Sequence, residues 1–273
     1  RASARRERGG YACVRPCVAG GDLGRRDGNI YRRLGKGVTR VFEERQDLPV
    51  YIRLGGSRSL FVERPPRIGA AMRTALALAA VALGQQDAVS LFTIADAMAT
   101  GVKNVSGKGA IARVARLLSE QTPGGGTALA AALSQLAAMK ARRGLVVLVS
   151  DFFDDDGIEG VLRALSLLPH RLLLVQLTRT QDADPALLPE LYGEVVIDDG
   201  ERAGGIAITV TSELLDRYRA AYRRFCESLD AFADKRGATL VRVDADRDVL
   251  DQLAPLLLTG GMTLRAFPAS ACR

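Results

Sequence analysis

Four oxygen-bearing side chains stand where they could bind a divalent metal ion. They follow apolar or glycine-rich segments of the chain: Ser57 and Ser59 after segment 48–54, Thr127 after three glycines, and Asp151 directly after segment 144–150. Mg²⁺ prefers oxygen ligands and usually keeps some waters. Glycines let the backbone approach a ligand closely. The residue types therefore predict one metal site built from three loops.

Short apolar segments that alternate with segments of helical periodicity must position these loops. We expect strands at 48–54, 88–94, 99–105, 144–150, 171–177 and 238–244. We expect helices at 68–85, 110–120, 128–142, 158–168, 212–236 and 248–258, and a hairpin around 198–205. The aliphatic run GLVVLVS is typical of a parallel strand that is covered on both faces. The pattern predicts a doubly wound, mostly parallel α/β sheet with helices on both faces, which binds ligands beyond the carboxyl ends of its strands.

Composition indicates a globular protein with an uneven charge. The chain has 273 residues, of which 48% are hydrophobic and 25% charged. The longest apolar stretch, 74–84, is much shorter than the ~18 residues of a membrane span. Residues 1–47 contain 12 Arg and Lys against 6 Asp and Glu, whereas the remainder is nearly neutral. We expect a basic, strand-rich extension at 1–45 that packs on a main domain at 46–265, followed by a tail at 266–273.

Cysteine and histidine offer little metal chemistry. Cys13 and Cys17 have a spacing that zinc could use, but no second pair of ligands accompanies them. Cys226 lies in a helical pattern and is expected in the core. We expect reduced thiols in a cytoplasmic protein. The opening RASARRERGG is not typical of a signal peptide, because no apolar run follows its arginines.

Several blocks of the chain resemble a known family. The succession of an apolar strand, Ser-x-Ser, Gly-Gly-Gly-Thr and strand-Ser-Asp resembles the von Willebrand factor A domain, a Rossmann-like fold with a metal-ion-dependent adhesion site. More narrowly, GGDLGRRDGNIYRRLGK (20–36), VFEERQDLPVYI (41–52), GGSRSL (55–60), PGGGTALAAAL (123–133) and LVVLVSDFFD (145–154) resemble the bacterial family called domain of unknown function 58. The resemblance covers nearly the whole chain.

The chain departs from the family pattern at the metal site itself. The adhesion motif usually begins with aspartate, and Gly55 stands there instead. Asp151 is then the one certain anion, so we expect Mg²⁺ binding to be weak or absent. Asp154, with Asp155 and Asp156, could compensate through waters. The alternative for these residues is an exposed acidic turn that caps the helix at Ile158.

The resemblance implies a protein-interaction role without chemistry of its own. In the adhesion mechanism, the metal accepts an acidic residue of a partner protein. Members of the family are often encoded near MoxR-type AAA+ ATPases, which implies an adaptor for such an ATPase in the assembly or maturation of other proteins. Partner contacts are expected at Asp22, Asp27 and Asp154. In helix 212–236, an aromatic core face beside a solvated basic face is the first interpretation, and a partner-binding face is the alternative.

Two other function classes remain open from the sequence. A metal-assisted phosphoryl-transfer enzyme would need more carboxylates than this site has. A nucleic-acid binder would use the basic arm, although few aromatic residues interleave its arginines. A phosphate loop is not indicated, because the glycines of GVKNVSGKGA have the wrong spacing. A Ser–His–Asp hydrolase is not indicated either, because His170 is expected at the amino-terminal end of a strand.

Overall fold

The computed structural model describes residues 10–16, 38–43, 48–55, 59–94, 98–122, 129–188, 193–197 and 205–258. For 10–16, 38–43, 59, 93–94, 98–100 and 197 it describes the backbone alone. The chain divides into two compact units, Arg1–Asp47 and Leu48–Arg273. In the first unit, β1 (Gly10–Pro16) pairs antiparallel with β2 (Val38–Glu43). This hairpin agrees with the expected strand-rich extension, whereas its packing on the main domain stays a prediction.

The second unit is built on a six-stranded sheet with the order β10-β7-β6-β3-β4-β5. All neighbouring strands are parallel except β5, which runs antiparallel to β4. The strands are β3 (Pro49–Gly55), β4 (Ala88–Ile94), β5 (Met98–Val105), β6 (Leu145–Ser150), β7 (Arg171–Thr178) and β10 (Thr239–Asp244). The doubly wound, mostly parallel sheet is therefore confirmed.

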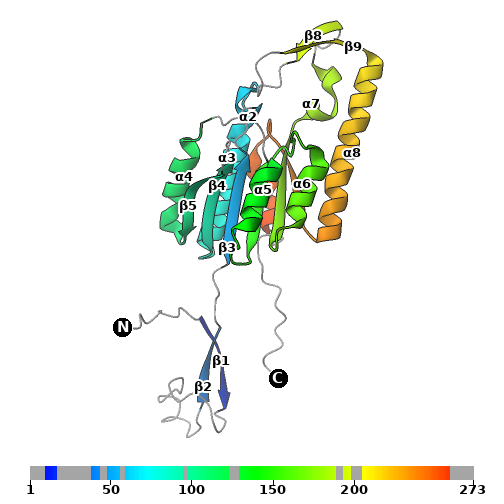
Figure 1. Ribbon diagram of the computed structural model, residues 1–273. Coiled ribbons are helices and arrows are strands. Elements are labelled where there is room, and N and C mark those ends of the chain that lie inside the picture. The colour runs from blue at the N-terminus through cyan, green and yellow to red at the C-terminus, as the bar shows by residue number, and fades with distance from the viewer. Residues whose placement is uncertain are drawn as a thin grey trace. The chain divides into compact units, whose positions relative to one another are not determined.

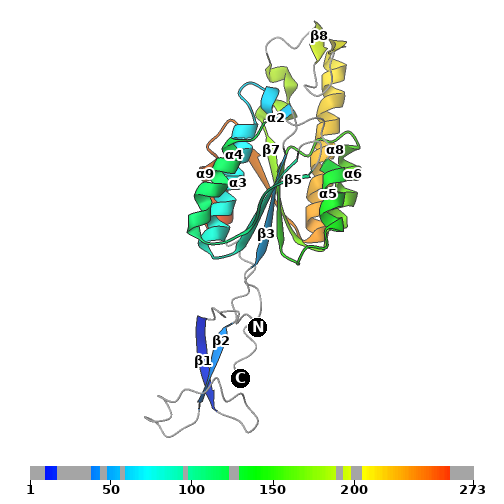
Figure 2. The ribbon, with the colours of Figure 1, turned by 60° about the vertical axis from the view of Figure 1, so that its left-hand side comes forward.

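Helices cover both faces of this sheet, as Figure 2 shows with the sheet seen along its edge. One face packs against α3 (Ile68–Gly84), α4 (Ile111–Ser119) and α9 (Val249–Leu258). The other packs against α5 (Leu129–Ala138), α6 (Gly157–Ser166) and α8 (Ser212–Arg236). All six residues of β6 are buried, because this strand lies inside the sheet with helices on each side.

Shorter elements complete the unit. They are α2 (Ser59–Val62), the 3₁₀ turn η2 (Lys108–Ala110), α7 (Thr180–Ala183) and the 3₁₀ turn η3 (Pro185–Leu187). The expected hairpin is present as β8 (Gly193–Ile197) paired antiparallel with β9 (Ile206–Val210), and it lies near the amino-terminal end of α8 (Figure 1). Among the described helices, none has the length and hydropathy to cross a bilayer.

Local sequence explains where the longest helix begins and ends. The Thr211 hydroxyl accepts a hydrogen bond from the backbone N–H of Leu214, which caps α8. Gly237 ends the helix in the left-handed region, with φ of 63°. Gly144 permits another tight contact: a β-carbon there would lie 2.1 Å from the carbonyl oxygen of Pro49. The start of β6 can therefore lie against the start of β3 only with glycine at this position.

Candidate functional site

The topological switch point of the sheet, where the strand order reverses, lies between the carboxyl ends of β3 and β6. From β3 the chain proceeds to β4 and β5 on one side of the sheet, and then to β6, β7 and β10 on the other. Open α/β sheets bind ligands at such a point. A β-carbon at Gly55 would lie 3.5 Å from the Ser150 hydroxyl oxygen and 3.4 Å from Leu60 Cδ1. The carboxyl ends of β3 and β6 therefore lie side by side at one edge, and the loop directly after β3 lies outside the described residues.

Asp151 begins the loop after β6 and is held inside the protein, with 5% of its surface exposed. Its Oδ1 accepts hydrogen bonds from the backbone N–H of Phe153 and from the Ser150 hydroxyl, both at 3.3 Å. Between them, Phe152 has φ of 66°, a left-handed conformation that costs a non-glycine residue about 1 kcal/mol. This turn buries Asp151 and Phe152 but leaves Phe153 42% exposed.

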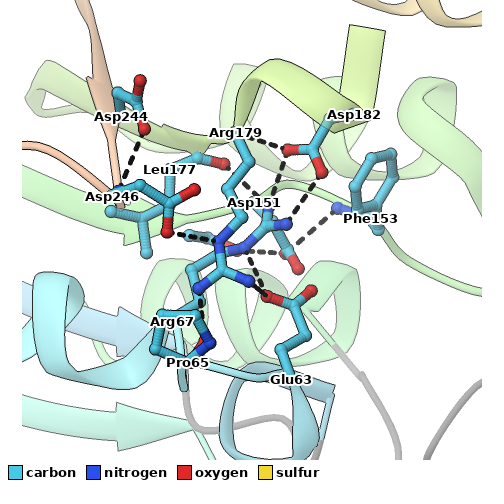
Figure 3. A network of polar contacts seen from close by, with 11 residues as sticks. Glu63, Pro65, Arg67, Asp151, Phe153, Leu177, Arg179, Asp182, Asp244 and Asp246 are labelled. Carbon is cyan, nitrogen blue, oxygen red and sulfur yellow. Dashed lines mark hydrogen bonds and ion pairs between the residues drawn. The ribbon is translucent and has the colours of Figure 1, made fainter. Parts of the chain in front are cut away.

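Arg67 is the positively charged residue that opposes the rise in the pKa of Asp151 caused by burial. It immediately precedes α3, and its side chain is 4% exposed. Its Nη1 and Nη2 donate to the two oxygens of Asp182 at 2.9 and 2.8 Å, and Nη1 also donates to the Leu177 carbonyl at 3.2 Å. Its Nε donates to Glu63 at 2.9 Å. The guanidinium is therefore fully engaged within the protein (Figure 3).

A second buried arginine, Arg179, lies directly after β7 and shares Glu63 and Asp182 with Arg67 as partners. Its side chain is 2% exposed and makes ion pairs with Glu63 at 3.3 Å and Asp246 at 3.2 Å. It also donates to the Pro65 carbonyl, and its backbone N–H donates to Asp182 at 2.8 Å. We call Glu63, Arg67, Arg179, Asp182 and Asp246 the edge cluster. It joins the α2–α3 connection to the loops after β7 and β10 (Figure 3).

The charges of the edge cluster affect the protonation of Asp151. Burial raises the pKa of Asp151 from its ordinary value of 3.8 to about 6, although Arg67 and the Phe153 N–H oppose the shift. Burial by itself would lower the pKa of Arg67, but Asp182, with Glu63 and Asp151, raises it above the ordinary value. At neutral pH, Asp151 is thus a costly buried anion near an arginine that stays charged.

The other residues predicted for the metal site cannot be placed beside Asp151. Ser57 and Thr127 lie outside the described residues, as do Asp22 and Asp27 of the predicted partner contacts. Ser59 is the first residue of α2, and only its backbone is described. The structure therefore brings together Gly55, at the end of β3, and the turn of Asp151, and the hydroxyl ligands stay a prediction.

Asp154 has a structural role that the sequence did not indicate. Its Oδ2 accepts from the backbone N–H of Ala130, in the first turn of α5, at 3.1 Å, and its Oδ1 accepts from the N–H of Asp156 at 2.9 Å. Asp156, which precedes α6, makes no side-chain capping bond to that helix. The acidic turn thus caps α5 through Asp154, whereas the cap was expected on the helix at Ile158. Its predicted contact with a partner stays untested.

A divalent metal fits the described side chains poorly. Gly55 has no carboxylate, Asp151 already accepts two hydrogen bonds through one oxygen, and the charge of Arg67 acts on it. Within the part of the chain that the structure describes, no three His, Cys, Asp or Glu side chains are grouped to hold a metal. The ion pairs that the structure shows at this edge are those of Arg67 and Arg179 with Glu63, Asp182 and Asp246.

A row of four aromatic side chains begins at the same edge and follows α8. Phe153 stacks on Phe225 with ring centroids 5.0 Å apart, Phe225 stacks near Tyr222 at 6.1 Å, and Tyr222 stacks near Tyr218 at 6.3 Å. We call these residues the aromatic row. Tyr218 is 40% exposed, and its hydroxyl donates to the Asp182 carbonyl at 3.0 Å. The two rings at the ends of the row, Phe153 and Tyr218, are therefore exposed to solvent, although an aromatic core face was predicted for this helix.

Two other sequence predictions can be placed. His170 immediately precedes β7, where its Nδ1 accepts a hydrogen bond from the Gly144 N–H, so this residue is buried at the amino-terminal edge as predicted. Cys226 is a free thiol of intermediate burial on α8, whereas a core position was expected. The residues that sequence reasoning missed are Arg53 and the whole edge cluster. An arginine inside the apolar segment VYIRL was the one visible signal.

The chain also matches the model of a known protein family. The model described as "Protein of unknown function DUF58" matches residues 13–228. This chain belongs to that family. Among curated proteins, no sequence matches the chain. The family assignment confirms the resemblance of the five sequence blocks and covers residues 13–47 of the hairpin unit and most of the sheet unit.

Solved structures similar to this family member include two proteins from Bacteroides. The conserved hypothetical protein BatB from Bacteroides thetaiotaomicron is 15% identical, over 79% of this chain and 98% of its own, with a TM-score of 0.45. An aerotolerance-related membrane protein from Bacteroides fragilis is 14% identical, over 79% of this chain and all of its own, with a TM-score of 0.47. A von Willebrand factor type A protein from Catenulispora acidiphila is 13% identical, over 69% of this chain and 44% of its own, with a TM-score of 0.40.

Proposed function

We propose that this DUF58 protein is a non-enzymatic protein-interaction module that uses the carboxyl edge of its sheet to bind a partner. We further propose that it serves as an adaptor for a MoxR-type AAA+ ATPase in the assembly or maturation of other proteins. The observation that carries the first proposal is the exposed phenyl ring of Phe153, which lies two residues after the buried Asp151. Aromatic side chains are enriched at the energetically important positions of protein interfaces.

The aromatic row supports this proposal because it is stacked before any partner binds. Phe225 and Tyr222 lie between Phe153 and Tyr218, so the exposed rings at its two ends rest on further rings. A side chain that is already held in place loses less conformational entropy on binding. The ATPase rests on the family resemblance alone. A metal-assisted phosphoryl-transfer enzyme has no support from the described carboxylates, since no three of them are grouped around a metal position.

The proposed surface can be tested with Phe153→Ala and a purified MoxR-type ATPase of the same organism. We expect the variant to weaken binding by about tenfold or more, because truncating an aromatic hot-spot residue at the centre of an interface costs about 2 kcal/mol or more. Biolayer interferometry with the immobilised chain measures the Kd. Leu167→Ala is the matched control, since Leu167 is 67% exposed and lies after α6, near the opposite edge of the sheet.

The two parts of the proposal fail in different ways. Absence of binding by the unaltered chain would exclude this ATPase as its partner. Equal affinities for the unaltered chain, Phe153→Ala and Leu167→Ala would exclude the carboxyl edge as the contact surface. Circular dichroism must show that Phe153→Ala keeps the fold, since its ring also contacts Phe225.

A further inference from the structure

Arg53 is a fully buried arginine near the carboxyl end of the central strand β3. Its exposed fraction is 0%. Residues 50, 52 and 54 pack on the α3 face of the sheet, so the intervening Arg53 lies on the α5 face. Its neighbours in register are Phe92 on β4 and Leu148 on β6, both buried. Ser90 on β4 and Ser150 on β6 share this face, but their hydroxyls bond to the Asn104 N–H and to Asp151, and neither pairs with Arg53.

The guanidinium of Arg53 has no counter-ion among the residues that the structure describes. Its Nε, Nη1 and Nη2 are all buried without a hydrogen-bond acceptor. Burial lowers its pKa to about 10, so it is still protonated at neutral pH. Arg67, which is buried to a similar extent, engages two carboxylates and a carbonyl. An isolated buried charge is strongly unfavourable, and proteins normally pair such groups.

The position of α5 adds a second source of positive potential. Tyr51, two residues before Arg53 on the same face, donates from its hydroxyl to the Arg142 carbonyl, just beyond the carboxyl end of α5. Arg53 lies about 7 Å further along the strand, toward the amino-terminal turn of this helix. Helix amino termini attract anions, and the Ala130 N–H there already binds the carboxylate of Asp154.

We infer that Arg53 is the cationic centre of an oxyanion-binding site between β3 and the first turn of α5. The ligand is a carboxylate or a phosphate, since both present two oxygens that match the forked donors of a guanidinium. The sign of the charge is opposite to that of a metal site: a carboxylate is missing at Gly55, and a guanidinium is present two residues earlier. This inference goes beyond the proposed function and does not depend on the ATPase.

Anion-dependent stability tests the inference on the whole chain. Sodium phosphate is added at constant ionic strength, and the thermal unfolding midpoint is followed. We expect a rise of several degrees for the unaltered chain, because a ligand that binds the folded state stabilises it by mass action. We expect no rise for Arg53→Met. Arg217→Met is the matched control, since Arg217 has a side chain that is 76% exposed, and it should respond like the unaltered chain.

A peptide carboxylate and inorganic phosphate separate the sources of the anion. Calorimetry with a blocked Gly-Asp-Gly peptide, against Gly-Asn-Gly, tests a carboxylate supplied by another protein, whereas inorganic phosphate tests a small free anion. Binding of either anion that requires Arg53 supports the site and identifies its source. Failure of both to bind the unaltered chain overturns it. An equal midpoint shift in Arg53→Met also overturns it, because the effect is then a general one of the salt.

Arg53→Lys keeps the inference testable if Arg53→Met fails to fold. Lysine retains the charge but lacks the planar fork. We expect it to weaken anion binding at least tenfold while the chain still folds. Unchanged anion affinity in Arg53→Lys would overturn the assignment of the guanidinium as the centre of the site.

Discussion

Arg67→Met is expected to lower the free energy of unfolding by about 3–5 kcal/mol, the cost of removing one partner from a buried ion pair. The substitution leaves the carboxylate of Asp182, 12% exposed, without its bidentate partner. It also frees the Leu177 carbonyl and takes from Asp151 the charge that favours its ionised form. Methionine nearly preserves the volume, so the loss reports on charge and hydrogen bonding.

Urea unfolding measures this effect, with Arg217→Met as the control. Arg217 pairs with Glu213 on the surface of α8, at 2.7 Å, with side chains that are 76% and 75% exposed. Exposed pairs contribute about 0–1 kcal/mol, so the control should change little. A loss below about 1 kcal/mol for Arg67→Met would mean that the edge cluster does not stabilise the fold as its geometry indicates.

Asp151→Asn is expected to stabilise the protein at pH 7.5 by about 3 kcal/mol, from the rule that one pKa unit corresponds to 1.36 kcal/mol. Burial raises the pKa of Asp151 from 3.8 to about 6. Its folded form therefore binds the proton more tightly than its unfolded form. This group lowers stability as the pH rises through the window between those two values, and the cost is fully present above it. Asparagine avoids the cost and can still accept from the Phe153 N–H.

The difference in unfolding free energy between Asp151→Asn and the unaltered chain should therefore depend on pH. Unfolding in urea with a chelator, at several pH values from about 4 to 7.5, should give a difference that shrinks toward zero at the acidic end. The contributions of the other titrating groups are the same in both proteins, so they cancel in the difference of the two unfolding free energies. A variant that is less stable than the unaltered chain at pH 7.5 would show that a favourable partner holds the Asp151 carboxylate ionised.

Elements with a strong local signal could be predicted from the sequence. GLVVLVS gave a strand buried along its whole length, since only a strand covered on both faces tolerates such a run. Helix 212–236 was predicted at its observed bounds because Thr211 and Gly237 mark its ends. The helix expected at 128–142 is shorter, ending at Ala138, and no comparable glycine stop follows that residue.

The edge cluster could not be predicted because its partners are far apart in the chain. Arg67 and Asp182 are separated by 115 residues, and nothing in the residues around either one specifies the other. Their contact depends on where the sheet places the α2–α3 connection and the loop after β7. Asp154 shows the same limit: an acidic turn before a helix suggests a cap on that helix, but its carboxylate reaches α5, which precedes it in the chain.

Titration calorimetry of Mg²⁺ and Mn²⁺ into the unaltered chain tests most directly whether the carboxyl edge, with Gly55 and the buried Asp151, holds a divalent metal. We expect no heat of binding up to about millimolar metal, because a hard cation needs several oxygen ligands and Gly55 leaves Asp151 as the one carboxylate of the predicted site. Gly55→Asp serves as the comparison, since a β-carbon there makes ordinary contacts of 3.4–3.5 Å. Micromolar binding by the unaltered chain that Asp151→Ala abolishes would show that the metal site works despite Gly55.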